Sequence, residues 1–108
     1  MSKAAAVSRR LPLISCVIPT YNRAAFLSAA IESALGQDFP ISEFEIIVVD
    51  DGSTDETPWI LERFKGKVKV IRQREQGQGE TLRTGIRAAR GLIIASLDAD
   101  DVWKPQKL

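Results

Sequence analysis

The chain has 108 residues, of which 44% are hydrophobic and 27% charged, and its formal net charge is +1. This length suits one small domain with a modest core, and the near-neutral charge argues against a partner such as nucleic acid that is recognised through bulk charge. No apolar run approaches the ~20 residues of a membrane-spanning helix, and the absence of histidine excludes Ser-His or Cys-His catalysis by these residues.

The beginning of the chain predicts an arm, a strand and a helix. Residues 1–10 are polar and rich in alanine, so we expect a flexible N-terminal arm. Residues 13–18 form a β-branched run before Pro19, which is typical of a buried strand, with Cys16 as a core residue. Asn22 is expected to cap the following helix. The spacing of that helix predicts six core residues: Phe26, Leu27, Ala30, Ile31, Ala34 and Leu35.

The middle of the chain predicts a second strand, a second helix and a third strand. Residues 44–49 are apolar and lead directly into Asp50 and Asp51. Thr57 precedes a proline, which is typical of a helix N-cap, and we expect Trp59 to pack within the fold. Residues 67–71 alternate between charged and apolar side chains, which indicates an edge strand at the rim of the sheet.

A loop, a third helix and a fourth strand complete the chain. Residues 76–79, Gln-Gly-Gln-Gly, favour a flexible loop over a phosphate-binding loop, because no strand directly precedes them. The next helix is expected to face the sheet with Leu82, Ile86 and Ala89, and solvent with Arg83, Arg87 and Arg90. Residues 92–97 are apolar, which is typical of a strand covered on both faces, and they lead into Asp98, Asp100 and Asp101.

Alternating strands and helices predict an α/β fold with a mainly parallel sheet flanked by helices, as in half of a Rossmann-like domain. The carboxyl ends of parallel strands meet at one edge of the sheet, where ligands bind. We therefore expect one crevice lined by the residues that follow three strands: Pro19, Thr20 and Tyr21, then Asp50 and Asp51, then Asp98 to Asp101. Such close carboxylates repel one another unless a divalent cation binds between them. An aromatic ring, carboxylates and a cation suit a sugar nucleotide.

Four segments in order resemble the family-2 glycosyltransferases of the GT-A fold. They are VIPTYNR at 17–23, IIVVDDGSTD at 46–55, GIRAARG at 85–91 and LDADDVWKP at 97–105. The resemblance covers about residues 13–108. It implies a metal-dependent, inverting transferase that uses a nucleotide-diphospho-sugar, in cell-wall or polysaccharide biosynthesis.

The resemblance also implies roles for single residues. Pro19, Thr20 and Tyr21 would lie along the nucleotide base, and Asp51, with Asp50 beside it, would accept a hydrogen bond from the base. Asp98 would reach the ribose or the water shell of the metal, and Asp100 would bind Mg²⁺ or Mn²⁺ at the diphosphate. Asp101 is a possible second metal ligand, and Arg83 could reach a phosphate.

Two departures from the family pattern matter. Thr84 stands where the family often has Asn after Arg83, which puts a nucleotide contact by that helix in doubt. The family's acceptor half and general base are expected beyond Leu108, so residues 11–108 would form a truncated nucleotide-sugar-binding domain. We therefore expect donor binding without efficient transfer, and the acceptor, whether glycan, lipid or protein, stays unknown.

Other interpretations remain open beside this one. The chain could be a non-catalytic nucleotide-binding fragment; a receiver-like signalling module is disfavoured, because the third strand lacks an acceptor Asp at its end. An apolar strand left at the edge of the sheet invites pairing, so we expect a homo-oligomer. We expect a cytoplasmic location, at the inner face of the membrane if a longer parent protein carries a membrane segment.

Overall fold

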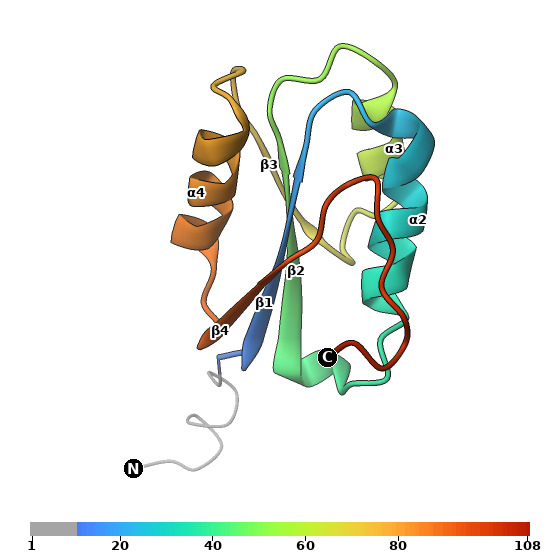
Figure 1. The fold of residues 1–108 in the computed structure, drawn as a ribbon, viewed down its shortest axis with the longest axis vertical. Helices are drawn as coiled ribbons and strands as arrows, with labels where there is room; N and C mark the ends of the chain where they lie inside the picture. Colours follow the sequence, from blue (N-terminus) through green and yellow to red (C-terminus); the bar gives the residue numbers. More distant parts are fainter. Residues whose placement is uncertain (1–10) are drawn as a thin grey trace.

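The computed structural model describes residues 11–108, and the expected arm, residues 1–10, lies outside them. A four-stranded sheet in the order β3-β2-β1-β4 forms the middle layer, with helices on both of its faces (Figure 1). The elements follow one another as β1 (Ile14–Thr20), α2 (Ala24–Leu35), the 3₁₀ turn η1 (Ile41–Glu43), β2 (Phe44–Asp50), α3 (Thr57–Glu62), β3 (Lys69–Arg72), α4 (Gln78–Ala88) and β4 (Ile93–Ser96). The predicted α/β fold is confirmed.

The two central strands carry the core and align the ends of the sheet. β1 pairs in parallel with β2, and the register places Thr20 opposite Asp50. Both strands are almost fully buried, as their apolar β-branched residues predict. Cys16 is part of this core, and burial raises the pKa of its thiol to about 12, which keeps it protonated and unreactive. The carboxyl ends of β1 and β2 therefore lie side by side.

Helices α2 and α3 cover one face of the sheet. The contact stripe of α2 consists of Leu27, Ala30, Ile31 and Ala34, all fully buried. The prediction of a core position for Phe26 is wrong, since it is 53% exposed: it lies one residue before the stripe and so to one side of it. Trp59 is likewise 73% exposed, because the short helix α3 buries Ile60 and Leu61 instead.

Among residues 11–108, helix α4 alone covers the other face. It packs through Thr81 and Gly85, and the predicted contact face of Leu82, Ile86 and Ala89 is wrong, since Ile86 is exposed. A Cβ added at Gly85 would lie 2.3 Å from Cγ1 of Val17 and 3.2 Å from Cγ2 of Val49. Because Gly85 lacks a side chain, the helix backbone can approach the sheet there, and this close approach fixes which side of α4 faces inward.

The sheet has β3 at one rim, as predicted, and β4 at the other. The expectation that the fourth strand is covered on both faces is wrong in the described part of the chain, where β4 pairs only with β1 and Leu92 is 85% and Ile93 51% exposed. After β4 the chain crosses to α2, where the Trp103 N–H donates to Ser33 Oγ and the ring packs against the core. Within residues 11–108, no helix has the length and apolar character needed to cross a membrane.

Candidate functional site

A cavity of about 340 Å³ opens at the carboxyl ends of the strands. Most of the predicted site residues line it together: Pro19, Thr20, Tyr21, Asp51, Asp98 and Asp100. Further lining residues were not predicted as site residues: Arg23, Glu75, Gly77, Gln78 and Thr81. Arg23 belongs to a segment that carries the family resemblance, and its position directly after the Pro-Thr-Tyr turn could have marked it. The others come from the loop after β3 and the start of α4, for which the sequence favoured a simple flexible loop.

Asp51 joins the end of β2 to the loop that follows β3. Its Oδ1 accepts hydrogen bonds from Gln73 Nε2 and from the Gln76 N–H, each at 2.9 Å, and its Oδ2 accepts one from the Gly77 N–H at 3.0 Å. Burial by itself raises the pKa of this carboxyl, but these hydrogen bonds outweigh it and hold the pKa below the usual value. Asp51 is therefore a buried, ionised acceptor at the cavity wall.

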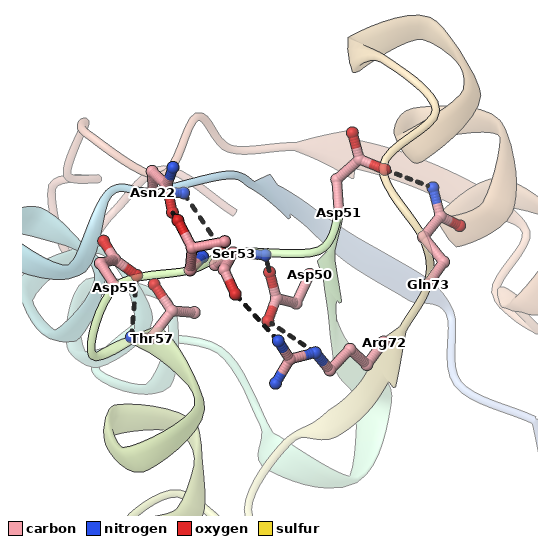
Figure 2. A network of polar contacts seen from close by, with 9 residues as sticks. Asn22, Asp50, Asp51, Ser53, Asp55, Thr57, Arg72 and Gln73 are labelled. Carbon is pink, nitrogen blue, oxygen red and sulfur yellow. Dashed lines mark hydrogen bonds and ion pairs between the residues drawn. The ribbon is translucent and has the colours of Figure 1, made fainter.

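Asp50 points to the opposite side of the strand and does not line the cavity. Figure 2 shows its carboxylate directed toward Arg72, whereas the neighbouring Asp51 is directed toward Gln73. Its Oδ1 accepts from the Ser53 N–H at 3.0 Å, and its Oδ2 lies 3.7 Å from Arg72 Nε. Successive side chains of a strand alternate between faces. The predicted nucleotide contact by Asp50 does not fit this position, and its carboxylate instead holds the turn after β2.

Two loops that flank the cavity are tied together by Asn22 and Asp55 (Figure 2). Asn22 has a positive φ of 50°, and its Oδ1 accepts from the Thr54 N–H at 2.8 Å. Asp55 accepts from the Ala24 N–H at 3.1 Å and from the Thr57 N–H at 3.0 Å. The predicted caps, Asn22 for α2 and Thr57 for α3, are therefore wrong. A single carboxylate from the connecting loop serves the first amide of both helices.

The acidic segment after β4 divides between two environments. Asp98 and Asp100 line the cavity, and Asp100 Oδ2 lies 3.9 Å from Arg23 Nε. Asp101 lies outside this cavity and accepts from the Val102 N–H at 2.8 Å. Residues 11–108 contain no group of three or more His, Cys, Asp or Glu residues that could hold a metal by themselves. The role of Asp101 as a second metal ligand stays a prediction, and its carboxylate binds the N–H of the next residue.

The remaining donors still fit a cation that arrives with a phosphate ligand. Mg²⁺ is usually held by one or two carboxylates together with substrate phosphates and waters, not by a complete protein cage. Asp98 and Asp100 supply two hard oxygen donors at one cavity wall. Both residues are exposed, so their carboxylates are open to a ligand. This donor set suits a metal–diphosphate complex and does not suit a free ion.

Two other predicted residues differ in their access to the cavity. Arg83 lies on the exposed side of α4, 3.2 Å from Glu80 through its Nε, and does not line the cavity. Thr20 does line it, and its buried hydroxyl has no hydrogen-bond partner among the described residues. Because an unpaired buried hydroxyl is costly, a ligand that reached this group would satisfy it.

Comparison with known proteins decides the family. Residues 15–108 match the model of glycosyl transferase family 2. The chain belongs to this family. The receiver-like alternative is thereby excluded, and the resemblance carried by the four segments is confirmed.

Individual relatives agree with this assignment. An uncharacterized glycosyltransferase of Nostoc sp. is 48% identical over 99 residues, which are 88% of this chain and 30% of that protein. The structure of Staphylococcus aureus TarS 1-349 in complex with UDP is 34% identical with a TM-score of 0.81, covering 87% of this chain and 29% of that one. A mannosyltransferase from Pyrobaculum calidifontis in complex with GDP-Man and Mn²⁺ is 31% identical with a TM-score of 0.75, covering 88% and 29%. The GT-A fold is thus confirmed, and the chain spans less than a third of each of these proteins.

Proposed function

We propose that the cavity binds the nucleoside diphosphate part of a nucleotide-sugar, and that the chain is the donor-binding part of an inverting, metal-dependent glycosyltransferase. The observation that carries this proposal is the meeting of Tyr21, Asp51, Asp98 and Asp100, from three separate strand ends, around one cavity. Two structurally similar family members were solved with UDP and with GDP-Man and Mn²⁺, which supports a ligand of this class.

The proposed roles follow from the chemistry of each group. The half-exposed ring of Tyr21 offers a stacking face to the base, beside the unpaired Thr20 hydroxyl. Asp51 uses three of its roughly four acceptor positions on the loop, and an N–H of the base would share the fourth with the Thr81 side chain, which also contacts this carboxylate. Asp98 accepts from ribose hydroxyls. Asp100 would hold Mg²⁺ or Mn²⁺ at the diphosphate, where the ion would neutralise charge on the leaving nucleoside diphosphate.

We further propose that residues 11–108 do not supply the general base. In an inverting transfer the acceptor oxygen bonds to the anomeric carbon, the bond to the diphosphate breaks, and a base takes the acceptor proton. Asp51 is bound to the loop, and Asp98 and Asp100 are assigned to ribose and cation. Glu75 is the remaining carboxylate at the cavity. The proposal would be contradicted if the chain catalysed sugar transfer or donor hydrolysis and Glu75→Gln abolished that activity.

Calorimetric titration of the chain with UDP and GDP, each with and without Mn²⁺, tests the donor site. We expect at least one of them to bind, more tightly with Mn²⁺ than without it, because the ion offsets repulsion between the diphosphate and the carboxylates Asp98 and Asp100. Uridine and inorganic diphosphate are the controls for base and phosphate contributions. If neither nucleoside diphosphate binds under any condition, the proposal is wrong.

We also propose that the unpaired edge of β4 joins two copies of the chain. Its apolar side chains are exposed, among them Ile93 and Ile94, and its outer backbone groups have no strand partner in the described part of the chain. Light scattering should show a dimer at high concentration. Ile94→Lys should be a monomer, with the melting temperature that the wild type shows at concentrations too low for it to dimerise. Val70→Lys, on the other edge strand, should remain a dimer. A monomeric wild-type chain at high concentration would refute this proposal.

A further inference from the structure

Three side chains from separate elements form a continuous chain of hydrogen bonds beside the cavity. Thr84, on α4, donates through Oγ1 to Gln73 Oε1 at 2.7 Å. Gln73, directly after β3, donates through Nε2 to Asp51 Oδ1 at 2.9 Å. Gln73 and Thr84 do not line the cavity themselves. They connect the helix to the carboxylate that does.

The direction of these hydrogen bonds is fixed by the chemistry of the groups. An ionised carboxylate only accepts, so Gln73 must turn its amide nitrogen toward Asp51 and its amide oxygen toward Thr84. The Thr84 hydroxyl must then donate to that oxygen. The Glu80 carbonyl oxygen, 3.0 Å from Oγ1, is a second acceptor for the same single proton, and Gln73 at 2.7 Å is the nearer of the two. If the Gln73 amide were reversed, its oxygen would face the Asp51 carboxylate, and two hydrogen-bond acceptors would lie against each other.

The position of Asp51 controls more than its own oxygen atoms. The same carboxylate holds the backbone amides of Gln76 and Gly77, and Gly77 lines the cavity directly before α4 begins. If Gln73 released Asp51, the carboxylate would keep its hydrogen bonds to the Gln76 and Gly77 amides but lose one of the three that set its orientation. The Thr84 hydroxyl therefore contributes, through Gln73, to the geometry of this cavity wall.

We propose that Gln73 and Thr84 are positioning residues for the nucleotide: Thr84 orients the Gln73 amide, and Gln73 holds the Asp51 carboxylate in the rotamer that faces the base and anchors the loop. This inference rests on the proposed donor site. It also gives Thr84 a role without any nucleotide contact, although it stands where the family pattern often has Asn.

The test compares Thr84→Val, which removes the hydroxyl at nearly constant shape, with Thr84→Ser, which keeps it. We expect Thr84→Val to weaken UDP binding about threefold to tenfold, the value of one lost hydrogen bond, and Thr84→Ser to bind like the wild type. NMR titration of the Asp51 carboxyl gives an independent readout. Its pKa should rise toward the usual value in Thr84→Val and stay low in Thr84→Ser, since the charged groups that line the cavity, Arg23, Glu75, Asp98 and Asp100, are the same in both.

A second variant keeps the proposal falsifiable if Thr84→Val does not fold. Gln73→Leu should raise the Asp51 pKa directly, and adding Thr84→Val to it should have no further effect on UDP affinity. The inference is overturned if a folded Thr84→Val or Gln73→Leu matches the wild type in Asp51 pKa and UDP affinity, or if their effects simply add. If the wild type binds neither UDP nor GDP, the donor site is wrong, and the Asp51 titrations alone then decide whether Gln73 and Thr84 position this carboxylate.

Discussion

Replacing Asp55 with alanine should lower the free energy of unfolding by about 2 kcal/mol, because one side chain satisfies the first amides of two helices and a helix cap contributes about 1 kcal/mol. The Asp55 carboxylate accepts from the Ala24 N–H of α2 and the Thr57 N–H of α3. Urea denaturation followed by circular dichroism measures the loss. Glu56→Ala, at the neighbouring exposed carboxylate, is the control, and an equal effect of the two variants would contradict the double-cap role.

The contribution of Asp55 also has a defined pH dependence. Burial raises the pKa of its carboxyl, but hydrogen bonds with Thr57 and Ala24 outweigh this and lower it from 3.8. A lowered pKa in the folded state means that the stabilisation is complete above the unfolded value and is lost as the pH falls through the folded value. The stability difference between wild type and Asp55→Ala should therefore be constant near neutral pH and shrink below about pH 4.

Replacing Asp100 with asparagine should remove most of the Mn²⁺-dependent gain in UDP affinity, by about tenfold or more, because a charged ligand to the cation is lost. Binding without metal should be equal or tighter, since the variant removes a negative charge near the diphosphate and frees Arg23, 3.9 Å away. This opposite response with and without Mn²⁺ distinguishes a metal ligand from a residue that only shapes the cavity. Calorimetric titration with UDP gives both values.

The matched control for this experiment is Asp101→Asn. Asp101 is adjacent in sequence and also acidic, but it lies outside the cavity and accepts from the Val102 N–H. It should leave UDP binding unchanged both with and without Mn²⁺. If Asp101→Asn reduces the Mn²⁺ effect as much as Asp100→Asn does, the assignment of the cation to Asp100 is wrong.

The fold was predictable because its signals are local. The apolar runs of β1 and β2 and the Leu27-Ala30-Ile31-Ala34 stripe of α2 each follow from spacing within one segment. Parallel pairing then brings Tyr21, Asp51 and Asp98 to one edge of the sheet. The cavity walls that follow β1, β2 and β4 are therefore predictable from the sequence.

The features that were missed depend on contacts between distant segments. The cap of α2 comes from Asp55, 31 residues away, so a rule based on neighbouring residues selected Asn22 instead. The inward face of α4 follows from the space over Val17 and Val49, which only Gly85 allows the backbone to enter. The sequence of the loop 73–79 contains no mark of its anchor, because Asp51 lies more than twenty residues before it.

The unequal covering of the two sheet faces has a consequence for motion. On one face, α2, α3 and the segment after β4 share a continuous core, whereas on the other α4 stands alone (Figure 1). Local opening requires least free energy where the fewest apolar contacts are broken. We therefore expect helix α4 and its preceding loop to open as one unit before the α2–α3 half does, which would let the cavity admit a bulky ligand without global unfolding.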